Sequence, residues 1–99
     1  MVSIIENINL KSIKTLDDLS NITTKEEIKN KSEVLSYLKT VTEPTMIAPK
    51  ILRDAITNET YSLGHSIYEY NGFIWNTMII YYFEKYNLKL SNDFLKMFD

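Results

Sequence analysis

Apolar residues recur at helical spacing along the first 40 residues of the chain. Residues 2–10 carry three isoleucines on one side, which predicts a short helix there. A second short helix is expected to begin at Thr15, whose side chain can cap the first turn, and to end near Asn21. Asp17 and Asp18 follow Thr15 and suit the positive end of the helix dipole.

A longer helix is predicted over residues 24–40. Thr23 and Thr24 are each followed three residues later by a glutamate, Glu26 and Glu27, which is a capping-box pattern. Pro44 follows shortly after and is expected to stop the helix. The apolar residues within the segment keep to one side of a helix: Ile28, Leu35 and Leu38, with Val34 and Val41 alongside.

The middle of the chain changes to a strand pattern. A short apolar run at residues 46–48 lies between two prolines, and residues 51–56 form a second candidate strand. Within residues 66–75, the pair Asn71-Gly72 separates two runs of aromatic and β-branched residues. Because both residues of the pair tolerate positive φ, we expect a hairpin with a type I′ turn.

Helical spacing returns after Trp75. Asn76 or Thr77 can cap a helix whose apolar residues follow at i, i+3, i+4 and i+7, and Asn87 is a plausible stop. A last short helix, capped by Ser91, is expected over residues 92–98. The chain is therefore predicted to be a single α+β domain over residues 1–99. It would have N-terminal helices, a small central antiparallel sheet with the Asn-Gly hairpin, and C-terminal helices packed on that sheet.

Composition narrows the functional classes. The 99 residues include no cysteine, which excludes a disulfide scaffold and thiolate metal sites. The net charge of −2 argues against a nucleic-acid-binding protein, which usually carries a basic patch. The N-terminus lacks the basic and apolar regions of a signal peptide, and the longest apolar run is far shorter than a membrane span. We therefore expect a cytoplasmic protein without membrane contact.

Candidate chemical groups are few. His65 is the single histidine, so a His-based catalytic pair or a multi-histidine metal site cannot form within one chain. The acidic pairs at residues 17–18 and 26–27 are explained by helix starts, and Asp54, in a strand-like stretch, more often makes a local hydrogen bond than does chemistry. With no phosphate loop and no activated nucleophile, we expect no enzyme, no metal and no cofactor.

Aromatic residues are dense between residues 68 and 86. Such a set can stack single-stranded bases, but Lys85 is the only basic residue between residues 66 and 88. Packing of a hairpin against a helix is therefore the favoured interpretation, with any exposed tyrosines serving a protein interface. The set comprises Tyr68, Tyr70, Phe73, Trp75, Tyr81, Tyr82, Phe83 and Tyr86.

Four short motifs carry a resemblance to a known group. Residues 54–57 read as an Asp-initiated strand, residues 70–75 as an aromatic-Asn-Gly-x-x-Trp hairpin, and residues 81–90 begin with Tyr-Tyr-x-Glu-Lys-Tyr. A short acidic-Phe-Leu helix follows at residues 93–95. In these motifs the chain resembles small bacterial immunity proteins of contact-dependent inhibition and other polymorphic toxin systems. It departs from the group at Asn71, where Asp is commoner, and at Ser91, where Pro is commoner.

The resemblance implies that the chain binds and neutralises a cognate toxin domain by covering its active site. If that toxin is a nuclease, its basic groove would be complemented by acidic residues. The residues expected at the interface are Asp17, Asp18, Glu59 and Glu69, with Tyr68 and Tyr70 as aromatic anchors. Two other classes stay open: a small regulatory or phage-type inhibitor or adaptor, and a single-stranded nucleic-acid-binding module.

Overall fold

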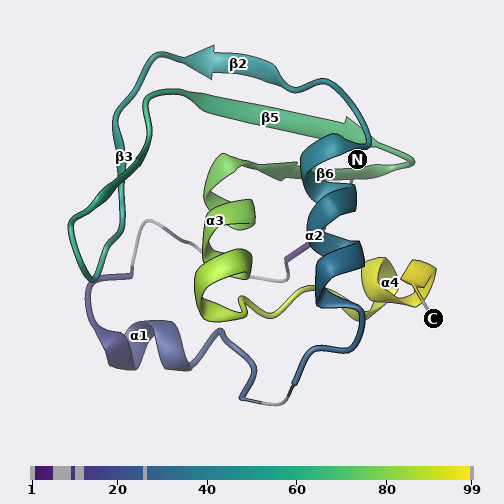
Figure 1. Cartoon of the computed structure of the whole chain (residues 1–99), viewed down its shortest axis with the longest axis horizontal. Coiled ribbons are helices and arrows are strands. Elements are labelled where there is room, and N and C mark those ends of the chain that lie inside the picture. The colour runs from purple at the N-terminus through teal and green to yellow at the C-terminus, as the bar shows by residue number, and fades with distance from the viewer. Residues whose placement is uncertain (1, 6–9, 11–12, 26, 99) are drawn as a thin grey trace.

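The molecule is a sheet with its helices gathered on one side (Figure 1). The computed structural model describes residues 2–5, 10, 13–25 and 27–98. Strands β2, β5 and β6 lie above the two parallel-lying helices α2 and α3, and α4 lies beside the lower end of α2 (Figure 1). In chain order the elements are β1 (Val2–Ser3), α1 (Leu16–Ser20), α2 (Lys31–Thr40), β2 (Thr45–Ala48), β3 (Leu52–Arg53), β4 (Thr60–Ser62), β5 (His65–Tyr70), β6 (Phe73–Asn76), α3 (Thr77–Tyr86), α4 (Asn92–Leu95) and the 3₁₀ turn η2 (Lys96–Phe98).

The α+β prediction is confirmed, but the sheet is mixed. Its strand order is β1-β6-β5-β2, with β1 parallel to β6 and the other pairs antiparallel. The prediction of a helix over residues 2–10 is therefore wrong at its start, because Val2 and Ser3 pair with β6. Residues 6–9 of that predicted helix lie outside the described residues. Strands β3 and β4 form a separate two-stranded sheet.

The hairpin and the helix after it form as predicted. Asn71 and Gly72 have φ angles of 52° and 85°, and β5 and β6 pair on either side of them. Asn76 caps α3 by accepting a hydrogen bond from the Ile79 N–H at 2.9 Å. Asn87 ends α3 in the left-handed conformation at φ 60°. Each signal is local, so residues close in sequence determine these elements.

The predicted start of the long helix is wrong. Helix α2 begins at Lys31, and its N-cap is Asn30 at φ 63°. The backbone of residues 22–24 pairs instead with residues 87–89 beyond α3, through Thr24 N to Asn87 O at 3.0 Å and Lys89 N to Ile22 O at 2.8 Å. Backbone groups in this pairing cannot also form a helical turn. The predicted capping residue Glu26 lies outside the described residues.

The second candidate strand, residues 51–56, is also shorter than predicted. Only Leu52 and Arg53 form β3, and the chain then turns through residues 54–59 into β4. The side chain of Asp54 causes the turn, because it accepts hydrogen bonds from the N–H groups of Ile56 at 2.7 Å and Thr57 at 3.0 Å. Asn58 completes the turn at φ 61°.

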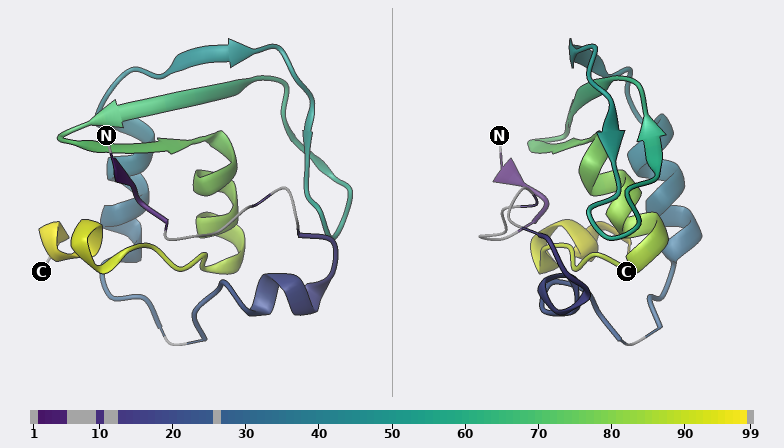
Figure 2. Two further views of the ribbon diagram at one scale, coloured as in Figure 1. Left: turned by 180° about the vertical axis from the view of Figure 1, so that it is seen from behind. Right: turned by 90° about the vertical axis from the view of Figure 1, so that its left-hand side faces the viewer.

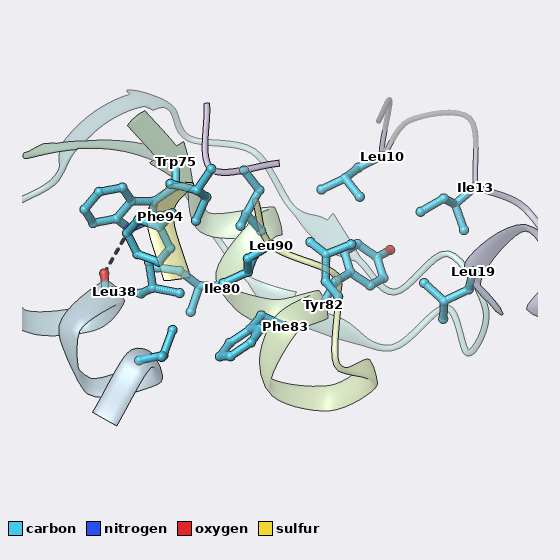
Figure 3. Close-up of a cluster of buried hydrophobic side chains, with 14 residues drawn as sticks. Leu10, Ile13, Leu19, Leu38, Trp75, Ile80, Tyr82, Phe83, Leu90 and Phe94 are labelled. Carbon is cyan, nitrogen blue, oxygen red and sulfur yellow. Dashed lines mark hydrogen bonds between the residues drawn. The ribbon is translucent and has the colours of Figure 1, made fainter. Parts of the chain in front are cut away.

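The core lies between the sheet and the helices (Figure 3). At one end Trp75 and Phe94 are buried, and the indole Nε1 donates to the carbonyl of Leu38 in α2 at 3.0 Å. At the other end Leu10, Ile13 and Leu19 gather around Tyr82 (Figure 3). The aromatic residues after residue 65 thus mainly hold the sheet against the helices, as the sequence predicted.

Among the described helices, none has the length and apolar character that crossing a bilayer requires.

Candidate protein-binding surface

The two faces of strand β5 differ sharply. Tyr68 pairs with Trp75 across the hairpin, and the two rings stack with their centroids 5.8 Å apart on the helix side of the sheet. Glu69 pairs with Ile74, and side chains alternate along a strand, so both point to the opposite face. No described helix lies on that face (Figure 2, right). We call it the open face.

The open face carries a shallow hollow with apolar side chains in it and acids beside them. The hollow measures about 390 Å³ and is lined by Glu43, Thr45, Ile47, Ile67 and Glu69. Thr45 pairs with Ile67 across β2 and β5, which places the two strands side by side in this hollow. Ile47 contributes exposed apolar surface to this hollow, because 51% of the residue is accessible.

The acids of the open face are not neutralised. Within the described part of the chain, neither Glu43 nor Glu69 forms an ion pair, whereas Glu59 and Glu84 do. Two carboxylates beside an apolar hollow produce a local negative potential that a basic partner would relieve. The open face is therefore complementary in charge and polarity to a surface that presents apolar side chains next to lysine or arginine.

The six residues predicted for partner binding do not form one surface. Asp17 and Asp18 lie in α1, at the opposite end of the molecule from β2 and β5 (Figure 1), and Glu59 lies in the turn before β4. On β5, Glu69 lies on the open face, while Tyr68 and Tyr70 point to the helix side. Tyr70 is 45% exposed and packs edge-on against Tyr37, so only part of its ring is accessible.

Asp18 has a structural role as well as an exposed position. Its carboxylate accepts hydrogen bonds from the N–H groups of Lys14 at 3.0 Å and Thr15 at 3.1 Å, and the Thr15 hydroxyl accepts in turn from the Asp18 N–H. These backbone hydrogen bonds lower the pKa of Asp18. The predicted helix start at Thr15 is thus confirmed as a capping box.

A buried polar cluster surrounds Asp54 beneath the turn of residues 54–59. The Asp54 carboxylate is 1% exposed and accepts hydrogen bonds from the hydroxyls of Tyr81 at 2.6 Å and Tyr86 at 2.7 Å. Lys85 lies between two acids, with its Nζ 3.5 Å from Asp54 and 3.7 Å from Glu59. The local hydrogen bonds expected of Asp54 are present, and further ones from α3 join them.

The protonation states of this cluster are fixed by its hydrogen bonds. Burial opposes ionisation of Asp54, but the hydroxyls of Tyr81 and Tyr86 and two backbone N–H groups outweigh it and hold its pKa far below the usual range. Burial and the bond to Asp54 raise the pKa of Tyr86 to about 12 and raise that of Tyr81 as well. The cluster therefore holds an aspartate and two neutral phenols, which tie the turn to α3.

Comparison with protein-family models, curated proteins and solved structures gives no match to this chain. The surface is therefore interpreted from its own residues. Glu69 is the one sequence-predicted residue on the open face; Glu43, Ile47 and Ile67 were missed. The alternation of side chains on β5 could have placed Ile67 with Glu69, and apart from Tyr68.

Among the described residues, no group of three or more acidic or histidine side chains could hold a metal ion.

Proposed function

We propose that the chain is an inhibitor that binds a cognate bacterial toxin domain through its open face and neutralises it by occlusion. The observation that carries the proposal is a sheet face with an apolar hollow, two unneutralised glutamates and no described helix over it. A toxin domain with a basic groove, such as a nuclease, offers the complementary charge. The motifs in which the chain resembles immunity proteins support the same class of partner.

The open face also separates this proposal from nucleic-acid binding. Phosphates are attracted by lysine and arginine and repelled by carboxylates, and the open face carries Glu43 and Glu69. The aromatic rings that could stack bases are largely committed elsewhere: Trp75, Tyr82 and Phe83 are buried in the core. A protein partner is therefore favoured over a nucleic acid.

The proposal predicts that a toxin domain is encoded next to this chain, and that domain is the partner used in the test. Binding is measured by calorimetry with the purified proteins, and protection is measured by co-expression in cells. In Glu69→Lys, a positive charge replaces the central acid of the open face, so we expect the dissociation constant to rise at least about tenfold, which is about 1.4 kcal/mol. Ile67→Glu should weaken binding similarly, because it buries a charge in the apolar hollow.

The matched control is Glu33→Lys. Glu33 is an exposed acid of α2, so the change in net charge is the same but lies away from the open face. Binding by this variant should stay within about threefold of the wild type. The proposal fails if the wild-type chain neither binds nor protects. It also fails if both charge reversals weaken binding equally, since long-range charge alone would then explain the effect.

A further inference from the structure

Two connections of the chain meet at one corner of the molecule, where β2 leads to β3 and β4 leads to β5 (Figure 1). We call residues 46–53 and 60–66 the corner. Ala48 in the first segment pairs with His65 in the second, and β3 pairs with β4. This backbone pairing fixes the side chains of the two segments next to one another.

The corner exposes large apolar side chains. Leu63 is 74% exposed and Ile51 is 56% exposed. Both directly adjoin the pair of Leu52 and Ser62, so they lie near each other. Leu52 is 5% exposed and points inward, and neighbours along a strand point to opposite sides, so Ile51 points outward.

Met46 extends this apolar surface. It is 65% exposed, and its terminal methyl group lies over Gly64, because a Cβ atom at Gly64 would stand 3.0 Å from Met46 Cε. Gly64 follows Leu63 directly, so Met46 and Leu63 lie close together. A single exposed apolar residue is ordinary, but several at one place indicate a surface that contacts something apolar.

The charge of the corner is opposite to that of the whole chain. Residues 46–53 and 60–66 contain Lys50, Arg53 and His65 and no aspartate or glutamate, whereas the chain has a net charge of −2. Lys50 and Arg53 are exposed, and neither forms an ion pair within the described part of the chain. Both line a hollow of about 280 Å³, together with His65. An anion in this hollow would contact two cations beside the exposed apolar side chains.

A lipid bilayer with anionic headgroups offers both properties, because its phosphates lie directly above apolar chains. Binding at its surface needs only a few apolar side chains with cations at the level of the headgroups. A stable protein interface, by contrast, buries about 800 Å² on each partner and involves about 20 to 30 residues, which is more than this corner presents. We expected no membrane contact from the lack of a spanning segment, but binding at the surface needs none.

We propose that the corner binds the surface of an anionic lipid bilayer, with a lipid phosphate in the hollow beside Lys50 and Arg53. The exposed side chains of Leu63, Ile51 and Met46 insert at the boundary between headgroups and acyl chains. The apolar and the cationic parts act together, since a single weak signal gives only marginal membrane binding. The corner does not include Glu69 of the open face, so this binding is measured without the toxin.

Co-sedimentation of the full chain with vesicles tests the proposal. The wild type should bind vesicles of equal parts phosphatidylcholine and phosphatidylglycerol at low salt, and bind phosphatidylcholine alone at least about tenfold more weakly. Leu63→Ser removes the most exposed apolar side chain of the corner and should lower the partition coefficient at least about fivefold. Lys50→Glu should lower it at least about tenfold. Unfolding midpoints should stay at the wild-type value, because both residues are exposed.

Each variant has a matched control at the other end of the molecule. Leu16→Ser removes a leucine of α1 that is 64% exposed. Lys25→Glu makes the same change in net charge as Lys50→Glu, in the connection between α1 and α2. Helix α1 and this connection lie far from the corner (Figure 1). Both controls should bind the mixed vesicles within about threefold of the wild type.

A wild type that does not bind the mixed vesicles overturns the proposal and leaves an acidic protein as the partner of the corner. Equal losses in Lys25→Glu and Lys50→Glu also overturn it, since net charge alone would then explain the binding. Inorganic phosphate probes the hollow without a lipid, and it should not displace the wild type from the vesicles at matched ionic strength. If it does, and Leu63→Ser binds like the wild type, the hollow is a site for free phosphate and the bilayer is excluded.

Discussion

The two faces of the four-stranded sheet are built from the same strands but have opposite surroundings. On the helix side, Trp75 is 1% exposed, stacks with Tyr68 and is hydrogen-bonded to α2. On the open face, Glu69 pairs with Ile74 and has no ion-pair partner in the described part of the chain. One residue along a strand thus separates a side chain that stabilises the fold from one that is available to a partner.

The largest expected difference between the faces is in β6. Trp75→Ala removes a buried indole and leaves a cavity, so the free energy of unfolding should fall by about 4 kcal/mol. Ile74→Ala, on the open side of the same strand, should cost only about 1 kcal/mol, because the residue is half-buried and its loss leaves no closed cavity. Urea unfolding followed by far-ultraviolet circular dichroism measures both. Equal losses would mean that the open face is packed as tightly as the covered one.

The buried acid Asp54 should behave differently from the acids of the open face. The hydroxyls of Tyr81 and Tyr86 both donate to the same oxygen of the Asp54 carboxylate, Oδ2. In Asp54→Asn, an amide NH₂ replaces that oxygen, so the two hydroxyls lose their acceptor. We expect a loss of about 2 to 3 kcal/mol in the free energy of unfolding. Tyr86→Phe removes one donor from the cluster and should cost about 1 kcal/mol. If Asp54→Asn unfolded at the wild-type urea midpoint, the cluster would not be stabilising the turn.

The pH dependence of stability gives a second view of Asp54. Its folded-state pKa lies below its unfolded value, so its contribution is fully present above the unfolded pKa of about 4 and is lost as the pH falls toward the folded pKa. The wild type should therefore lose more stability than Asp54→Asn between neutral pH and strongly acidic pH. Urea midpoints measured across that range compare the slopes of the two proteins. Parallel slopes would show that other carboxyl groups cause the acid sensitivity.

Signals that lie within a few residues predicted their elements, and contacts between distant residues overrode the rest. The Asn71-Gly72 turn, the Thr15 capping box and the helix from Asn76 to Asn87 needed only their neighbours. The start of α2 instead depends on the far end of the chain: Asn30 Nδ2 donates to the carbonyl of Phe98 at 2.9 Å, and Lys31 Nζ donates to Asn87 Oδ1 at 2.6 Å. No local pattern contains those partners.

The candidate surface also depends on contacts between distant residues, which local signals did not predict. Residue type alone selected acids and tyrosines along the whole chain, and only Glu69 among them lies on the open face. Its neighbours Glu43 and Ile47 reach the same hollow because β2 pairs with β5. That pairing joins residues about 20 positions apart, and the turn of residues 54–59 between them does not by itself decide which residues of β2 and β5 lie opposite each other. The helix side, by contrast, was anticipated from its dense aromatic residues.

The sharpest comparison uses two neighbours on β5. Tyr68→Ala removes a half-buried ring that stacks on Trp75 and should lower the free energy of unfolding by about 2 kcal/mol. Glu69→Ala changes an exposed side chain and should stay within about 0.5 kcal/mol of the wild type. Urea unfolding of the two variants at one pH and one salt concentration gives the difference.

The sign of the small Glu69 effect is informative. Glu43 and Glu69 line one hollow without a basic neighbour, so removing one carboxylate relieves a like-charge repulsion. We therefore expect Glu69→Ala to be slightly more stable than the wild type at low salt, and this gain should disappear at high salt as the charges are screened. A loss of stability at low salt would instead place Glu69 in a favourable contact of the folded chain and remove it from the interface.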